Sequence, residues 1–291
     1  MQLKMPNANF KLQLLKTTIL VLTLAAPLTS RCQLIPLPNA FAHNDYSHKR
    51  PLYDALDNGY NNIEADIFLK DGNLVVAHIN PFFKQHRTLE ALYLKPLLDR
   101  INQNRGKIYP GYDRPFTLMI DIKTEAEKTY AVLKTILEKY RPVITRYENG
   151  KIYNKQITVV LSGNKPYKSV MAENSRMVFI DQDLRAANRD TANANVFAMA
   201  SCKYSRLLHW DGTGSIPVAE RKILLNYVAK CHRFGKRVRL WASPENLGVW
   251  HELLNCGVDL INTDKLEQLK DFLLADRPQY PGASPEYAKA N

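Results

Sequence analysis

The sequence predicts an α/β protein, a TIM-like (β/α)8 barrel with a β-hairpin flap at its C-terminal mouth. Short apolar runs alternate with amphipathic helical patterns, which is typical of a parallel sheet built from βαβ units. The chain has 291 residues, 45% hydrophobic and 23% charged, which is enough for one barrel of about 250 residues and excludes a wholly disordered or fibrous chain. No Gly-rich phosphate loop follows the first apolar run, which favours the barrel over an open doubly wound sheet.

Nine segments have the composition of strands, at residues 40–43, 62–68, 74–78, 116–122, 157–161, 177–180, 205–209, 237–241 and 258–262. Helical patterns lie between most of them, at 51–58, 88–104, 125–140, 217–234 and 247–255. Only residues 69–73, with Asp71-Gly72, join the second strand to the third. So short a link forces antiparallel pairing, because a parallel crossover needs about a dozen residues. Segment 74–78 is therefore predicted to be the flap, and eight parallel strands remain.

The first 31 residues have the pattern of a secretory signal peptide. A basic stretch precedes an uncharged, mostly apolar segment at 17–30, which is shorter than the roughly 20 residues of a membrane-spanning helix. We expect export to the periplasm or the extracellular space, with a buried N-terminal helix as the alternative. Lipoprotein anchoring through Cys32 stays open, although Arg31 before it disfavours lipidation. Residues 32–275 are expected to form a single domain and 276–291 an extended tail.

Charge and cysteine content narrow the choice of partners. The chain has 40 Lys and Arg against 28 Asp and Glu, a net charge of +12, which favours anionic ligands such as phosphate esters. These cations are scattered along the chain, which argues against nucleic acid as a partner. Cys202, Cys231 and Cys256 match no CxxC-type metal site. A Cys231–Cys256 disulfide and three buried thiols are both open.

Acidic side chains stand at the predicted strand ends. Glu64 and Asp66 share one face of their strand because they are two residues apart, and so do Asp121 and Lys123 on the next barrel strand. The C-terminal ends of barrel strands form the active mouth. Crowded carboxylates resist ionisation unless a cation binds, and all-oxygen ligation suits one Mg²⁺ or Ca²⁺.

Two histidines complete this predicted site. His43 ends the first strand and His78 ends the flap. Beside a metal ion and Lys123, two imidazoles can serve as general base and general acid. Phosphodiester cleavage needs both functions, together with positive charge on the phosphoryl oxygens.

These motifs, in this order, resemble the glycerophosphodiester phosphodiesterase and PI-specific phospholipase C-like superfamily over residues 40–265. The resemblance rests on Ala42-His43, Ile63-Glu64-Ala-Asp66-Ile67, Lys70-Asp-Gly-Asn-Leu-Val-Val-Ala-His78, Leu118-Met-Ile-Asp121-Ile-Lys123, Val238-Arg-Leu-Trp241 and Cys256-Gly-Val-Asp-Leu-Ile-Asn-Thr-Asp264. It implies a divalent cation held by three carboxylates, an acid–base pair, a phosphate-binding lysine and a pocket wall. By this resemblance, the cation ligands are Glu64, Asp66 and Asp121, and the acid–base pair is His43 and His78. Lys123 is the phosphate-binding lysine, and Trp241 forms the pocket wall. The aspartate as third ligand is more similar to the sphingomyelinase D-type branch.

The chain departs from the family pattern at its first motif. The usual His-Arg-Gly is His43-Asn44-Asp45 here, so the arginine expected to hold phosphate is absent. Asn44 is predicted to replace it as a neutral donor, and Lys49 or Arg50 could restore the charge. Asp45 is predicted to add a metal contact or to cap the following segment.

The sequence therefore predicts an exported, metal-dependent phosphodiesterase acting on a glycerophosphodiester, phospholipid or related phosphodiester. The expected partner is a small-molecule or lipid substrate, with membrane contact or packing near Phe82 and Phe83. The reaction is hydrolysis or formation of a cyclic phosphate. Two alternatives remain: a non-catalytic phosphate-ester-binding barrel, which the missing arginine suggests, and a metal-dependent sugar isomerase or lyase.

Overall fold

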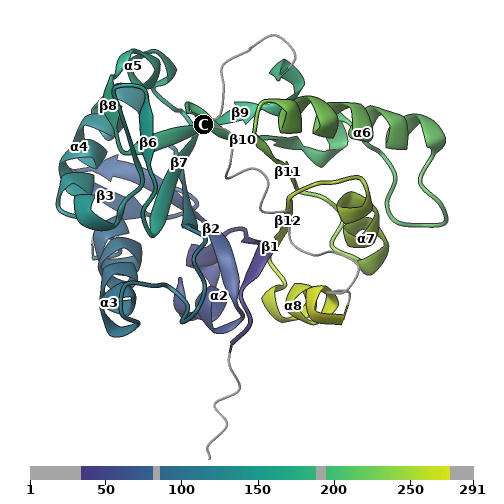
Figure 1. Ribbon diagram of the computed structural model, residues 1–291, viewed down its shortest axis with the longest axis horizontal. Helices are drawn as coiled ribbons and strands as arrows, with labels where there is room; N and C mark the ends of the chain where they lie inside the picture. The colour runs from purple at the N-terminus through teal and green to yellow at the C-terminus, as the bar shows by residue number, and fades with distance from the viewer. Residues whose placement is uncertain (1–33, 81–85, 188–194, 276–291) are drawn as a thin grey trace, which may run out of the picture. The chain divides into compact units, whose positions relative to one another are not determined.

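Eight parallel strands close into a barrel in the computed structural model, which describes residues 34–80, 86–187 and 195–275 (Figure 1). The strand order around the barrel is β1-β2-β4-β7-β9-β10-β11-β12, and β1 pairs with both β2 and β12. The strands are β1 (Leu37–Ala42), β2 (Tyr60–Lys70), β4 (Phe116–Ile122), β7 (Ile157–Gly163), β9 (Val178–Asp183), β10 (Phe197–Lys203), β11 (Arg237–Trp241) and β12 (Leu260–Thr263). The predicted barrel is confirmed.

The predicted flap is confirmed as well. Strand β3 (Asn73–Val76) runs antiparallel to β2, with Ile67 opposite Val76 and Lys70 opposite Asn73. Asp71 and Gly72 connect the two strands and both have positive φ, at 48° and 76°. This is the backbone that an Asp-Gly hairpin turn adopts. The hairpin returns the chain from Lys70, the end of β2, to the level of Asp66, where the Ala77 N–H donates to the Asp66 carbonyl oxygen.

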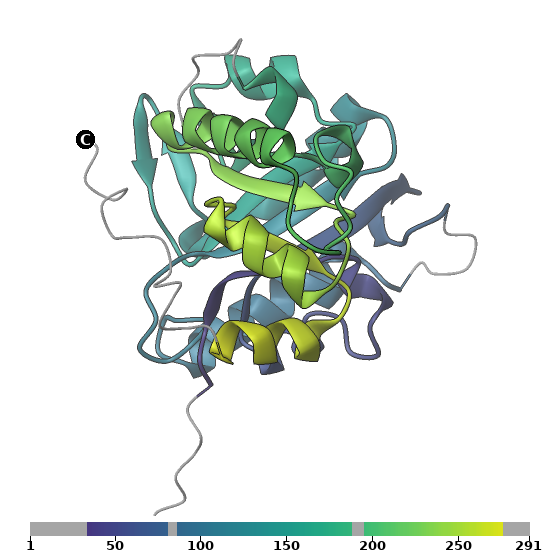
Figure 2. The same ribbon diagram turned by 90° about the vertical axis from the view of Figure 1, so that its right-hand side faces the viewer.

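Helices cover the outside of the barrel, and α6, α7 and α8 lie side by side on one part of it (Figure 2). The helices are α2 (Tyr53–Asp57), α3 (Lys95–Gln103), α4 (Ala126–Glu138), α5 (Tyr167–Ala172), α6 (Val218–Arg233), α7 (Leu247–Asn255) and α8 (Leu266–Ala275), with a π-helical turn η2 (Glu90–Leu94) before α3. The 3₁₀ turns are η1 (Asp45–Ser47), η3 (Arg141–Val143), η4 (Leu184–Ala186) and η5 (Tyr204–Arg206). A small antiparallel sheet joins β5 (Arg146–Glu148), β6 (Lys151–Tyr153) and β8 (Ser175–Arg176). Each of the five predicted helices is present with shifted or identical ends, whereas α5 and α8 were not predicted.

The barrel interior contains a buried apolar layer below the mouth. It is made of Phe41, Met119, Val160, Phe179, Met199 and Leu260, which come from six different strands. Inward side chains alternate with outward ones along each strand, so the inward residues two positions further on lie above this layer. Several of those residues are polar, which places the charged groups at the C-terminal ends of the strands.

The strand predicted at 205–209 is wrong. The strand at this place in the order is β10, Phe197–Lys203, and the predicted segment falls on η5 and the loop that follows it. The β10 sequence is Phe-Ala-Met-Ala-Ser-Cys-Lys, and alanine and serine have little intrinsic preference for strands. Pairing with β9 and β11 on both sides makes it a strand despite its composition.

Several predictions concern residues that the structure does not describe. The signal peptide at 1–31, Cys32, the tail at 276–291 and Phe82 and Phe83 all lie outside the described ranges. In the described ranges, no helix combines the length and the apolar character needed to cross a bilayer. The remaining cysteines, Cys202, Cys231 and Cys256, are three buried free thiols rather than a disulfide and a thiol.

Candidate active site

The C-terminal ends of the barrel strands surround a pocket of about 570 Å³. The structure brings every residue of the sequence-predicted site to its walls. They are His43, Asn44, Glu64, Asp66, His78, Asp121, Lys123 and Trp241. Seven of them come from the region between β1 and the end of β4, and Trp241 ends β11.

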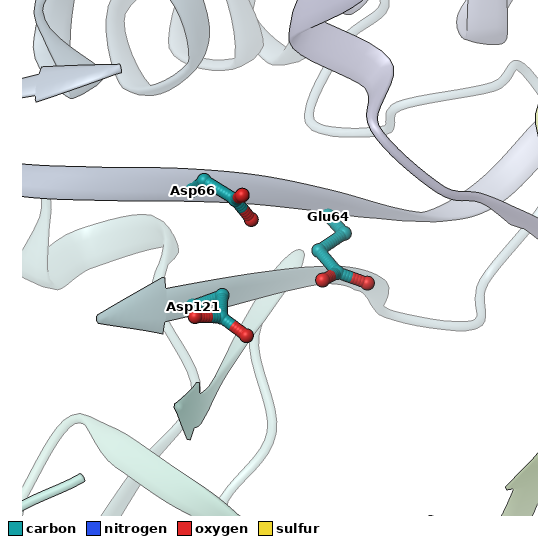
Figure 3. A group of neighbouring side chains, drawn as sticks. All are labelled: Glu64, Asp66 and Asp121. Atoms are coloured by element: carbon teal, nitrogen blue, oxygen red, sulfur yellow. The ribbon is translucent and has the colours of Figure 1, made fainter. Parts of the chain in front are cut away.

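Three carboxylates from two adjacent strands form the acidic centre of the pocket. Glu64 and Asp66 lie on the inward face of β2, and Asp121 on β4 is in register with Asp66. Each offers a carboxylate oxygen, and these oxygens all lie within 4.8 Å of one another. Figure 3 shows the three carboxylates converging from the two strands. Burial raises the pKa of Asp66, and the Tyr46 hydrogen bond and Lys123 offset part of that rise.

Two cationic side chains balance this centre. Lys123 Nζ lies 3.0 Å from both Asp66 Oδ2 and Asp121 Oδ1, and Arg239 Nη1 lies 2.8 Å from Glu64 Oε2. Burial alone would lower the pKa of Lys123, but its two carboxylate partners raise it overall. With all five groups ionised, three acids against two bases leave one negative charge. Hard oxygen donors with excess negative charge fit a divalent cation of the Mg²⁺ or Ca²⁺ type.

Two neighbours on β7 hold the Asp121 carboxylate in place. Ser162 Oγ donates a hydrogen bond to Asp121 Oδ2 at 3.1 Å. Gly163 has a φ of +67°, and a Cβ built there would lie 2.4 Å from Asp121 Oδ1 and 2.5 Å from the Ile122 carbonyl oxygen. Only glycine leaves room for the carboxylate at this point.

His43 is paired across the joint between the first and last strands. Its Nδ1 lies 2.9 Å from Asp264 Oδ1, and its Nε2 has no hydrogen-bond partner among the described residues. Partial burial would lower the pKa of His43, but the Asp264 hydrogen bond and the nearby Glu64 raise it overall. Burial alone would raise the pKa of Asp264, but the hydrogen bond and charge of His43, together with Asn44 and His48, lower it overall. A carboxylate on Nδ1 fixes the tautomer in which Nε2 can accept a proton.

His78 is tied to the acidic centre through Tyr46. The Tyr46 hydroxyl lies 2.8 Å from Asp66 Oδ2, 2.6 Å from Asn44 Oδ1 and 3.0 Å from His78 Nδ1. Its single proton can go to only one of them. The His78 side chain is 70% exposed, so its imidazole can reach the solvent-filled part of the pocket. Burial and Asp66 raise the pKa of Tyr46, which keeps the phenol protonated.

The structure corrects two expectations about the first motif. Lys49 and Arg50 are exposed and neither lines the pocket. Arg50 instead pairs with Asp54 and Asp57 at 2.9 Å each, so the suggestion that these cations restore the missing charge is wrong.

Asp45 makes no contact with the acidic centre. It is fully buried below the pocket, where Oδ2 accepts hydrogen bonds from the Leu52 N–H at 2.6 Å and the Tyr93 hydroxyl at 2.9 Å. Its predicted metal contact is wrong, and so is the predicted Asx-turn cap, because neither η1 nor α2 has a side-chain cap and the carboxylate instead holds the Leu52 N–H seven residues further on.

Sequence reasoning assigned no role to Arg239, Asp264 or Gly163. Arg239 was detectable, because it stands two residues before Trp241 on one strand and must share its inward face. Its guanidinium is buried, with the side chain 4% exposed, and it supplies a cation where the first motif lacks one. The role of Asp264 depends on strand pairing between β1 and β12, which no local pattern reveals.

Comparisons with known proteins identify the family of this chain. The family described as AIM6-like phosphodiesterase domain matches residues 31–181, just over half of the chain. Altered inheritance of mitochondria protein 6 of Eremothecium gossypii is 30% identical over 276 residues, covering 81% of this chain and 69% of that protein. The protein of the same name from Lachancea thermotolerans is 28% identical over 281 residues, and the match covers 80% of this chain but only 65% of the relative.

A solved structure shares the fold. A glycerophosphodiester phosphodiesterase from Parabacteroides distasonis superposes with a TM-score of 0.51 at 15% sequence identity, over 83% of this chain and 98% of that one. At this identity the likeness shows the fold alone. The family match over half of the chain and the relative that is 30% identical show that the chain belongs to the AIM6-like phosphodiesterase domain family.

Proposed function

We propose that this protein is a metal-dependent phosphodiesterase that cleaves a glycerophosphodiester, phospholipid or related phosphodiester. One observation carries the proposal. Three carboxylate oxygens lie within 4.8 Å of one another in a pocket that is also lined by two histidines and a lysine. The signal-like segment at residues 1–31 supports the further proposal that the protein acts after export.

Glu64, Asp66 and Asp121 would hold one Mg²⁺ or Ca²⁺. When bound, such an ion supplies positive charge to the non-bridging phosphoryl oxygens. Lys123 is placed to contact the same phosphoryl group, since its ammonium lies 3.0 Å from two of the carboxylates.

Two further residues would position the substrate. The Asn44 amide is a neutral donor beside His43. Its Nδ2 lies 2.9 Å from the imidazole Nδ1, which cannot accept from it while Nδ1–H donates to Asp264. Trp241, 37% exposed, provides an apolar wall for the alcohol of the substrate.

His43 and His78 would move the protons. His43 Nε2 accepts a proton from water or from a neighbouring hydroxyl of the substrate, while Asp264 stabilises the imidazolium that forms. Attack by water yields a phosphomonoester, and attack by a substrate hydroxyl two carbons away yields a cyclic phosphate. His78 donates a proton to the oxygen of the departing alcohol.

The purified protein is expected to turn over bis(p-nitrophenyl) phosphate or glycerophosphodiesters, to lose this activity in EDTA and to regain it with Mg²⁺ or Ca²⁺. Release of alcohol, followed with time, measures the reaction. Turnover that persists unchanged in EDTA would contradict metal dependence. Binding of phosphate esters without any turnover across the panel would instead favour a non-catalytic barrel.

Gly163→Ala is expected to weaken Mg²⁺ or Ca²⁺ binding by about 10- to 100-fold, the usual cost of disturbing the partners of a metal ligand. The added Cβ would meet Asp121 Oδ1 and force the carboxylate to move. Titration calorimetry with the metal alone measures the change. The matched control is Gly214→Ala, because Gly214 has a similar φ of +62° and nothing within 4 Å of its Cβ position. Equal affinity in the two variants would contradict the role given to Gly163.

A further inference from the structure

Cationic side chains gather at the ends of three consecutive barrel strands on one side of the pocket. Lys165, Arg185, Lys203 and Arg206 line the same pocket as the three carboxylates. They stand at or just after the C-terminal ends of β7, β9 and β10, which are consecutive strands in the barrel. This cationic rim begins beside β4, the strand of Asp121, and ends at β10, which is four positions from β2 in the ring of eight. Lys203 and Arg206 therefore lie on the opposite side of the mouth from Glu64 and Asp66.

Three members of the cationic rim form no ion pair with a described residue, and Lys165 acts on Asp181 and Asp183 only through longer-range electrostatics. Arg185 pairs with Asp183, with Nη2 2.6 Å from Oδ2. No carboxylate of the described residues lies within 4.0 Å of the side-chain nitrogens of Lys165, Lys203 or Arg206. Lys203 Nζ lies 5.9 Å from the centre of the Trp241 ring, which places its charge beside the apolar wall. With all groups ionised, four cations against the two carboxylates of β9 that line the pocket, Asp181 and Asp183, give this half of the mouth an excess of two positive charges.

The two halves of the pocket differ in what their cations do. Lys123 and Arg239 are engaged with the three carboxylates, so they balance charge that belongs to the acidic centre. Of the rim cations, only Arg185 has a carboxylate of the described residues within ion-pair distance. A simple phosphodiester carries one negative charge, at the phosphorus that must lie near Lys123. A simple phosphodiester bound in this way has no second negative charge that the cationic rim could bind.

We propose that the cationic rim is a second anion subsite, which binds a phosphomonoester on the alcohol that leaves the phosphodiester. The inference rests on the proposed phosphodiesterase function and narrows its substrate class to diesters with an additional phosphate on one arm. A flexible cation on each of several strand ends suits a phosphate, because three oxygens can accept from several donors at once. A cleft lined by one sign of charge also attracts an oppositely charged ligand and speeds its association.

Two substrates that differ by one phosphate test this subsite. Wild-type protein is expected to cleave glycerophosphoinositol 4-phosphate with a kcat/KM about tenfold above that for glycerophosphoinositol, through a lower KM. In the double variant Lys203→Met with Arg206→Met, this preference is expected to fall to about one. The matched control is Lys222→Met with Arg233→Met, which removes the same two charges from exposed positions of α6 outside the pocket and is expected to keep the preference.

The outcomes separate the subsite from the reaction. If glycerophosphoinositol is cleaved and the extra phosphate gives no advantage, or if the rim variant keeps the advantage, the subsite is refuted while the phosphodiesterase stands. If neither substrate is cleaved, the proposed function fails. The subsite is then tested by calorimetry, which compares the affinities for inositol 1-phosphate and inositol 1,4-bisphosphate. Tighter binding of the bisphosphate that is lost only in the rim variant supports the subsite, and equal binding overturns it.

Discussion

His43→Ala is expected to lower kcat for phosphodiester cleavage by about 10²- to 10⁴-fold, the usual contribution of a positioned general base. In the described residues, His43 Nε2 has no hydrogen-bond partner, so it is available to the substrate or to water. His43 Nδ1 is held by Asp264 Oδ1 at 2.9 Å. KM is expected to change little, because the acidic centre and Lys123 remain. Steady-state kinetics on one substrate separates the two parameters.

Asp264→Asn tests the same pairing through the pH dependence. Asp264 raises the pKa of His43, so the amide variant has a lower His43 pKa. A general base works in its neutral form, so kcat/KM rises with pH as His43 loses its proton. The acidic limb of the profile should therefore move to lower pH in Asp264→Asn. Asp271→Asn, an exposed position on α8, serves as the control, and an acidic limb that moves equally in both or in neither would refute the pairing.

Asp45→Asn is expected to remove a large pH-dependent loss of stability. Burial raises the pKa of Asp45 from 3.8 to about 6, even though its two hydrogen-bond donors oppose the rise. The folded protein therefore binds this proton more tightly than the unfolded chain. The free energy of unfolding falls as the pH rises from about 4 to about 6, by roughly 3 kcal/mol, and remains lower above that window. Asparagine keeps an oxygen acceptor for Leu52 and Tyr93 without the charge.

Urea unfolding at pH 4 and pH 7.5 measures this difference. The wild-type protein should lose roughly 3 kcal/mol more between the two pH values than Asp45→Asn does. Asp271→Asn should keep the wild-type dependence, because this aspartate is exposed. The same pH dependence in wild-type protein and Asp45→Asn would show that Asp45 is not the buried acid responsible.

The barrel and the flap were predictable because both depend on short-range signals. Alternating apolar runs mark the strands, and the five-residue link with Asp71-Gly72 permits only a hairpin. The convergence of Glu64, Asp66 and Asp121 follows from the two-residue period of strands and from parallel pairing, which put all three at one rim. Strand β10 escaped prediction, since its alanines and serine are strand residues only through their neighbours.

The rest of the pocket depends on contacts between distant parts of the chain. Arg239 donates a hydrogen bond to Glu64, which is 175 residues away in the sequence. Gly163, on the neighbouring strand, leaves the space that the Asp121 carboxylate occupies. The cationic rim is visible only when the order of strands around the barrel is known. Without that order, Lys165, Lys203 and Arg206 are three cations among the 40 Lys and Arg of the sequence.

The joint between β1 and β12 has a consequence for the order in which a competent protein arises. Ala40–Ala42 align with Ile261–Thr263, and His43 and Asp264 are 221 positions apart. A nascent chain on the ribosome can assemble the carboxylates on β2 and β4 early, because those strands are close in sequence. His43 can pair with Asp264 only after β12, the final strand, has been translated. The pairing of β1 with β12, which closes the barrel, therefore also orients the general base. A prematurely released fragment would contain the three carboxylates but no Asp264 to orient His43.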